Sequence, residues 1–227
     1  MMEQEIRAEM MKVCRWLSER TFVAADAGAV SARISPSQIL ITPRGQSLNW
    51  LVPEQLVPID AIGHSAAEAI EPSPTLPLHL AVYRQRTDIQ AVVLAQPPSA
   101  TAFALSGIPL VHPALAETVL TLGSVPITGY ATPYTEEAAA SIGHAIQNHD
   151  ALLLKHRGLL TVGLNLMDAL QKLERVEQLA TVLLAARSLD HIDLLPGAQV
   201  KKLMDLRARM KLGGKNPWSQ PRPENGE

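Results

Sequence analysis

Two apolar stretches decide the fold: A-V-V-L-A-Q-P-P-S-A-T-A at residues 91–102 and L-L-L-K-H-R-G-L-L-T-V-G at residues 152–163. The first predicts a buried strand over residues 89–94, followed by a short helix over 99–105 that ends at Gly107. The second predicts two apolar strands, over 151–154 and 159–162, joined by a Lys-His-Arg-Gly turn. These three strands are expected to form the interior of a sheet.

The remaining sequence alternates predicted helices with predicted strands. Apolar residues at helical spacing predict helices over residues 2–20, 76–86, 136–148 and 166–189, the last with Asn165 as its N-cap. Alternating and short apolar runs predict a hairpin of strands 30–34 and 38–42, and a further strand over 56–60. This order indicates an α/β or α+β fold in which helices flank a sheet.

Composition narrows the classes of protein. The chain has 227 residues, with 47% hydrophobic and 19% charged, which is enough to build one large domain with a substantial core. The formal net charge of -2 and the 4% aromatic content disfavour a nucleic-acid partner. No apolar run has the roughly 18 residues of a membrane helix, and the N-terminus lacks signal-peptide order, so we expect a cytoplasmic protein without membrane contact.

The C-terminal end differs from the rest of the chain. Residues 196–227 are rich in lysine and arginine and contain three prolines near their end, Pro217, Pro221 and Pro223. We therefore divide the chain into a domain over residues 1–195 and a basic tail over 196–227. The tail is expected to be solvated, with contact to a partner subunit as the alternative.

Several segments resemble the class II aldolase/adducin family. The family's enzymes read approximately A-V-V-H-T-H-S-x-x-A-T-A and L-L-x-N-H-G-L-x-x-x-G where this chain has its two deciding stretches. Further similar segments are P-L-H-L-A-V-Y at 77–83, Y-A-T-P-Y at 130–134 and Glu177. The resemblance implies a single-domain three-layer sandwich with a mainly antiparallel central sheet, and a homotetramer with its site between subunits.

The resemblance also implies where a zinc site would lie, and this chain departs from the family there. The three histidine positions hold Leu94, Gln96 and Arg157, and the position of the glutamate acid/base holds Thr75. Leucine has no lone pair, a glutamine carbonyl is a weak zinc ligand, and arginine is permanently cationic. We therefore expect no zinc and no other metal cofactor.

Two histidines near these positions are not expected to replace the lost ligands. His156 precedes Arg157 by one residue, and in an extended segment that shift places it on the opposite face. His79 lies on the apolar side of its predicted helix and is expected to be a packing residue.

The family's three phosphate-binding motifs are partly retained. Gly28, Ser31, Thr42, Gly45 and Ser73 remain, whereas Ala29, Arg44 and Pro74 replace small polar or serine positions. Arg44 could bind an anion through a bidentate contact, fill the phosphate hole, or point into solvent. The candidate ligand-binding residues are therefore Gly28, Ser31, Thr42, Arg44, Gly45, Ser73 and Arg157.

Three functions are compatible with these residues. The first is a catalytically degenerate relative of the aldehyde-lyases that binds a small anion or sugar phosphate, or acts as an oligomeric scaffold. The second is a metal-independent lyase or epimerase acting on a sugar phosphate, with Arg157 stabilising an enolate. The third is a regulatory subunit of an active paralogue.

Overall fold

One antiparallel sheet organises the molecule. The computed structural model describes residues 3–65, 69–189 and 191–219, and its six strands lie in the order β3-β2-β1-β4-β6-β5, each antiparallel to its neighbours. The strands are β1 (Ala29–Ser35), β2 (Gln38–Ile41), β3 (Val57–Asp60), β4 (Ala91–Ala95), β5 (Ala151–Leu154) and β6 (Gly158–Gly163). The predicted mainly antiparallel sheet is confirmed.

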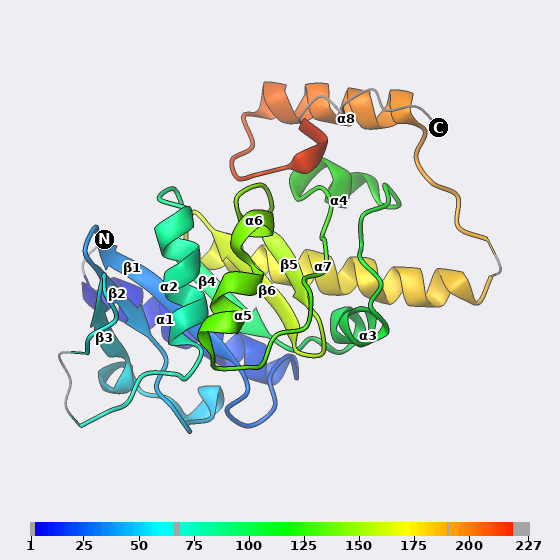
Figure 1. Ribbon diagram of the computed structural model, residues 1–227. Coiled ribbons are helices and arrows are strands. Elements are labelled where there is room, and N and C mark those ends of the chain that lie inside the picture. The colour runs from blue at the N-terminus through cyan, green and yellow to red at the C-terminus, as the bar shows by residue number, and fades with distance from the viewer. Residues whose placement is uncertain (1–2, 66–68, 190, 220–227) are drawn as a thin grey trace.

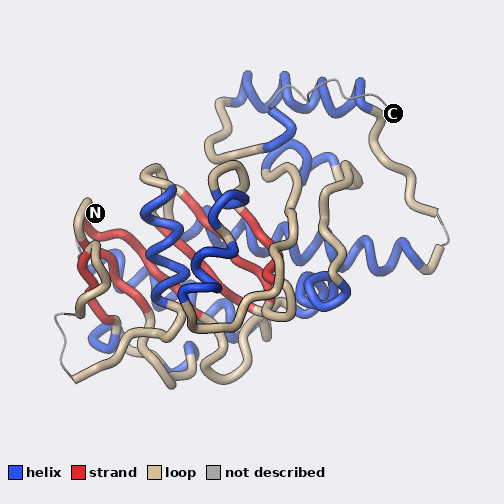
Figure 2. Tube along the Cα trace, in the orientation of Figure 1, coloured by secondary structure: helices blue, strands red, loops and turns tan. Residues whose placement is uncertain are grey.

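Helices cover both faces of this sheet (Figures 1 and 2). The longer elements are α1 (Glu3–Glu19), α2 (Leu76–Gln85), α3 (Pro98–Ser106), α7 (Leu166–Arg187) and α8 (Gly197–Met210). The shorter ones are α4 (Ala116–Thr121), α5 (Glu136–Ser141), α6 (Gly143–Ile146), η1 (Leu48–Trp50), η2 (Pro53–Gln55) and η3 (Pro217–Ser219). No helix in the described ranges is both long and apolar enough to cross a membrane.

The period of two in strand β4 separates two hydrophobic cores. Ala91, Val93 and Ala95 belong to the core beneath α1, α3 and α7, whereas Val92 and Leu94 belong to the core beneath α2 and α6. All five residues of the strand are buried. A sheet with a packed core on each side and helices outside both is the expected three-layer sandwich.

The sequence prediction differs from the structure in three helical regions, of which α8 is described below with the C-terminal segment. The single helix predicted over 136–148 is divided into α5 and α6 at Ile142 and Gly143. Helix α4 was not predicted, because its six residues are too few for a helical period to be visible.

The expectation of a solvated tail is wrong for its described part. Helix α8 packs on α4, and the segment after it returns to the domain. Arg207 is 6% exposed and donates hydrogen bonds to the backbone carbonyls of Leu120, Thr121, Gly213 and Gly214. The residues through 219 therefore form part of the folded domain.

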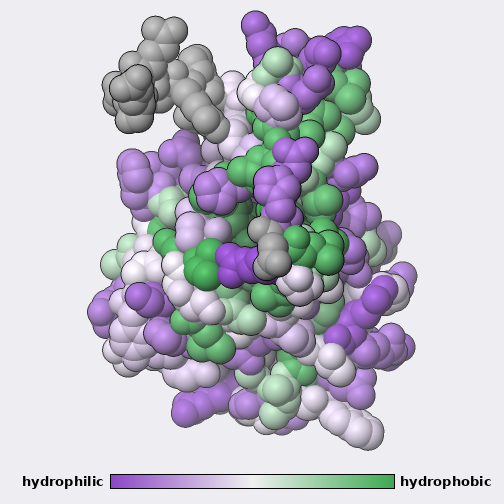
Figure 3. All heavy atoms as spheres, turned by 90° about the vertical axis from the view of Figure 1, so that its right-hand side faces the viewer, coloured by the Kyte–Doolittle hydropathy of each residue, from purple (hydrophilic) through white to green (hydrophobic). Residues whose placement is uncertain are grey.

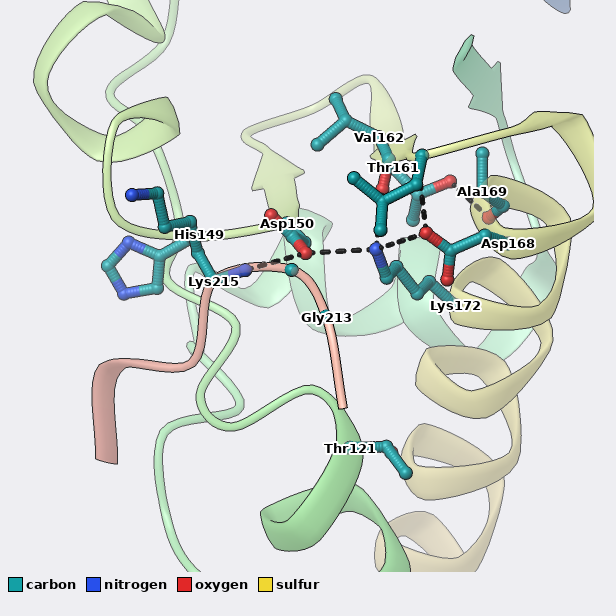
Figure 4. A network of polar contacts seen from close by, with 12 residues as sticks. Thr121, His149, Asp150, Thr161, Val162, Asp168, Ala169, Lys172, Gly213 and Lys215 are labelled. Carbon is teal, nitrogen blue, oxygen red and sulfur yellow. Dashed lines mark hydrogen bonds and ion pairs between the residues drawn. The ribbon is translucent and has the colours of Figure 1, made fainter. Parts of the chain in front are cut away.

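A buried ionic network holds this returning segment (Figure 4). Asp150 is 1% exposed and accepts hydrogen bonds from Arg86 and Lys172, each at 2.9 Å. Its second oxygen also accepts the backbone N–H of Lys215 at 2.9 Å, and Lys172 bonds Asp168 at 2.8 Å. One carboxylate thus connects α2, α7 and the C-terminal segment.

Apolar side chains are exposed where α7 ends. Figure 3 shows this face, and Leu184, Leu189 and Leu194 are 42%, 76% and 38% exposed. The contact with a partner subunit that we weighed for the C-terminal region stays a prediction.

We predict that Asp150→Ala lowers the free energy of unfolding by about 3–5 kcal/mol, because it leaves two buried cations without their shared carboxylate. Urea unfolding monitored by circular dichroism measures this loss. The matched control is Glu71→Ala, which removes the carboxylate partner of the exposed Arg44 and should cost no more than about 1 kcal/mol. Equal losses in the two variants would contradict the assigned role of Asp150.

Candidate functional site

The four positions that the resemblance aligns with metal ligands and an acid/base come from three neighbouring parts of the fold. Leu94 is near the end of β4 and Gln96 follows that strand, while Arg157 lies in the turn between β5 and β6. Ala95 pairs with Leu159, so this turn lies beside the end of β4. Thr75 is the N-cap residue of α2 and is 5% exposed.

Leu94 has become part of the hydrophobic core. It is 2% exposed and faces the α2 side of the sheet, where it belongs to the same apolar cluster as Val92 and Leu160. A branched alkyl group therefore occupies the position that resemblance assigns to a metal ligand.

The β5–β6 turn has a backbone that fixes Arg157 in place. His156 has φ of 58° and Gly158 has φ of 139°, and the Arg157 amide donates to the Leu154 carbonyl at 2.9 Å. A Cβ atom at Gly158 would collide with the carbonyl oxygen of Ala95. Glycine is thus required at 158, and this requirement sets the register of the turn.

The Arg157 guanidinium is partly buried without an anionic partner. Its carbon Cζ lies 5.5 Å from the centroid of the Tyr134 ring, and burial lowers the pKa of Arg157 below its usual range. Its Nη2 atom is buried and has no hydrogen-bond partner among the described residues. No ion pair joins Arg157 to a carboxylate in the described part of the chain.

A buried polar chain begins one helical turn after Thr75. His79 is fully buried, its Nδ1 lies 2.7 Å from the Ser31 hydroxyl, and that hydroxyl lies 2.9 Å from the Tyr83 hydroxyl. His79 Nε2 has no hydrogen-bond partner among the described residues. Desolvation lowers the pKa of His79 to about 3, and the positive charge of Arg157 adds to this effect.

This arrangement modifies two of the sequence predictions. His79 is buried as expected of a packing residue, but it is also hydrogen-bonded. The Ser31 hydroxyl bonds His79 and Tyr83 instead of standing open for a phosphate. Tyr83 was not singled out, although His79 and Tyr83 at i and i+4 of one predicted helix could have suggested that they share a partner.

Thr42 and Ser73, two other candidate phosphate-binding residues, form hydrogen bonds within the chain. The Thr42 hydroxyl accepts the Val30 amide at 3.2 Å, and the Ser73 amide donates to the Thr42 carbonyl at 2.9 Å. The Ser73 hydroxyl lies 2.9 Å from the Thr75 hydroxyl. Gly28 packs against Val23, where a Cβ atom would clash.

Arg44 points into solvent. Its side chain is 64% exposed and pairs with Glu71 at 2.9 Å, and the following Gly45 has φ of 67°. This placement agrees with the solvent-facing alternative and not with a filled phosphate hole, and anion binding at Arg44 stays a prediction. Arg157 is a second candidate cation for an anion in this region.

Comparison with known proteins places the chain in a family. Residues 8–184 match the family model described as Class II Aldolase and Adducin N-terminal domain. The chain belongs to the class II aldolase and adducin family. Among solved structures, YgbL from Escherichia coli, a putative aldolase/epimerase/decarboxylase, superposes with a TM-score of 0.83 at 26% identity, covering 88% of this chain and 98% of that one.

Curated relatives include a decarboxylase and an aldolase. The 3-oxo-tetronate 4-phosphate decarboxylase of E. coli K12 is 28% identical over 185 residues, which is 80% of this chain and 87% of the relative. The L-fuculose phosphate aldolase of Methanococcus maripaludis is 30% identical over 174 residues, covering 76% of this chain and 92% of the relative.

The side chains at the family's expected metal position do not fit zinc. An alkyl group, an amide and a guanidinium provide at most one weak neutral donor. His156 is exposed and lies against the Tyr130 ring, with ring centroids 6.1 Å apart. No group of three or more His, Cys, Asp or Glu side chains in the described ranges could hold a metal ion.

The buried His79 gives a testable dependence of stability on pH. Its pKa is about 3 in the folded protein against an ordinary value of 6.5, so the unfolded chain binds more protons between these values. The stability contributed by neutral His79 is therefore complete above about pH 6.5 and is lost as the pH falls toward 3. The loss is at most about 1.4 kcal/mol per pH unit from this one group.

We predict that His79→Phe reduces this slope between pH 6 and pH 4. Urea unfolding of both proteins at each pH gives the two slopes. His149, whose pKa burial also lowers, is present in both proteins and cancels in the comparison. Parallel slopes would show that His79 is not buried in its neutral form.

Proposed function

We propose that this class II aldolase family protein binds a small oxyanion at Arg157 and is not a metal-dependent aldolase. The observation that carries the proposal is the partly buried guanidinium without a carboxylate partner. A buried cation is costly unless it is paired, and the pairing group missing from the described chain is an anion.

The family supports the chemical class of the ligand. The names of the relatives in Escherichia coli and Methanococcus maripaludis both specify phosphorylated carbohydrate substrates. We infer that the ligand here is a sugar phosphate or a related small hydroxy acid. An arginine presents a planar pair of donors to a carboxylate or phosphate, which suits such a ligand.

Three further parts of the proposal follow from family resemblance or composition alone. They are a homotetrameric assembly, a role as an oligomeric scaffold where no ligand is turned over, and a cytoplasmic location.

Phosphate binding tests the role of Arg157. Arg157→Ala should weaken the binding of inorganic phosphate by about 10- to 100-fold, because hydrogen bonds to charged groups contribute about 1.5–3 kcal/mol. Isothermal titration calorimetry measures the change. The matched control Arg44→Ala removes an exposed arginine that already has a carboxylate partner, and it should leave the affinity within about twofold.

Metal content tests the second half of the proposal. We predict that purified protein dialysed against buffer without chelator carries no stoichiometric zinc, manganese or cobalt. Elemental analysis by mass spectrometry checks this. One tightly held ion per chain would contradict the proposal.

A metal-independent lyase or epimerase is the second candidate, and one contact favours it. The Tyr134 ring lies against Arg157, which places a phenol near a cation that could stabilise an enolate. Under this candidate, a screen of ketose phosphates finds retro-aldol cleavage or epimerisation that Arg157→Ala lowers by at least about 100-fold. Absent turnover, or turnover that survives Arg157→Ala, would remove this candidate.

A further inference from the structure

We propose that His79 and Arg157 together form a two-donor oxyanion site, in which Tyr83 acts through Ser31 to fix the imidazole tautomer so that Nε2 carries the hydrogen. This inference rests on the proposed function, because it requires that an anion binds at Arg157. It assigns His79 as a ligand-binding residue and Tyr83 as a positioning residue.

Counting hydrogens along the chain determines the tautomer. The Tyr83 phenol has one hydrogen and, in the described part of the chain, one recorded partner, the Ser31 hydroxyl at 2.9 Å. We infer that Tyr83 is the donor, and that Ser31 gives its own hydrogen to Nδ1 of His79 at 2.7 Å, because the described residues offer the Ser31 hydroxyl no other recorded acceptor. An imidazole that accepts at Nδ1 and is neutral must carry its hydrogen on Nε2.

The imidazole stays neutral at physiological pH. It is fully buried, and the Arg157 cation is close enough to disfavour a second positive charge on it. A second cation, Arg33, lies over the Tyr83 ring at 4.8 Å and donates to backbone carbonyls. His79 is thus a permanent neutral N–H donor between pH 5 and pH 8.

Two buried N–H donors on the same side of the sheet then have no acceptor. These are Nε2–H of His79 and Nη2–H of Arg157, neither of which has a partner among the described residues. Two donors cannot hydrogen-bond to each other, so a group that binds both must supply acceptor lone pairs. An oxygen of a carboxylate, a phosphate or an enolate does so, and its negative charge also pairs with the guanidinium.

Arg157 is the more exposed of the two proposed donors. It is partly exposed and lines a small hollow together with Thr128, Gly129, Ala138 and Ser141. No side-chain hydrogen bond in the described ranges holds the guanidinium. Its one recorded ring contact is with Tyr134, which is itself exposed. Because His79 is fully buried, the proposal requires a shift of the Arg157 side chain that admits an oxygen to the inner donor.

The test is binding of inorganic phosphate and of glycolate by wild-type protein and four variants. We expect His79→Phe and Tyr83→Phe each to weaken the better ligand by about tenfold, the effect of one neutral hydrogen bond. Tyr130→Phe is the matched tyrosine control at a 58% exposed ring, and it should bind as wild type does. Arg157→Ala tests the proposed function in the same series.

Nitrogen NMR of histidine-labelled protein gives a second readout that a packing role would not change. Wild type should show His79 in the Nε2–H form, and Tyr83→Phe should shift it toward a mixture of tautomers. This readout keeps the proposal falsifiable if His79→Phe does not fold. An Nδ1–H form in wild type would overturn the inference.

The outcomes separate the two proposals. If Arg157→Ala loses binding while His79→Phe and Tyr83→Phe bind as wild type does, the inference fails and the proposed function stands. If wild type binds neither phosphate nor glycolate, both fail, and the two donors are satisfied by water alone.

Discussion

The alternation of side chains along β4 is the constraint on which the site depends. Every residue of this strand is buried, and successive residues face opposite helical layers. Position 94 must therefore point into the layer beneath α2, whatever residue it holds. With leucine there, the position adds to the apolar core and offers no lone pair to a ligand. The same strand end fixes the β5–β6 turn, because Gly158 packs closely on the Ala95 carbonyl.

That geometry explains why a single arginine dominates the local electrostatics. The positive φ values at His156 and Gly158 set the backbone of the turn and so place the Cα atom of Arg157 beside the end of β4. A histidine there would be neutral or bind a metal, whereas arginine brings a permanent charge into a partly buried place. Burial lowers the pKa of the His79 imidazole, and the Arg157 charge adds to this effect. Arg157 and His79 are thus coupled, although they are far apart in the sequence.

The sequence predicted the sheet well because its strands carry their signal locally. The apolar runs at 91–95 and 151–163 correspond to β4, β5 and β6, and the helix after Asn165 begins as expected because the Asn165 side chain caps the Asp168 amide. The tail could not be predicted in this way. Its docking depends on Asp150 and Arg207, which are 57 residues apart and meet the same returning segment only in the folded chain. Long-range polar contacts of this kind leave no periodic trace in a sequence.

The site was harder to predict than the fold for a related reason. The substituted positions were visible, but the partners of each side chain were not. Arg44 is as cationic as Arg157, and only the observed Glu71 contact shows that its charge is already paired. His79 had the pattern of a packing residue, and only the Ser31 and Tyr83 hydroxyls distinguish it from one.

The two donors of the proposed site suit anion binding better than turnover. A metal is a Lewis acid that can polarise a carbonyl, whereas a guanidinium and a neutral imidazole N–H contribute charge and hydrogen bonds only. Proton abstraction needs a base with a pKa near neutrality, and none of the inner groups has one. The Nδ1 atom of His79 is occupied by Ser31, burial raises the pKa of Tyr83 above its usual range, and Thr75 has only a hydroxyl. A reaction here would have to take its base from the ligand or from Tyr134 at the rim, so oxyanion binding requires fewer additional groups than catalysis does.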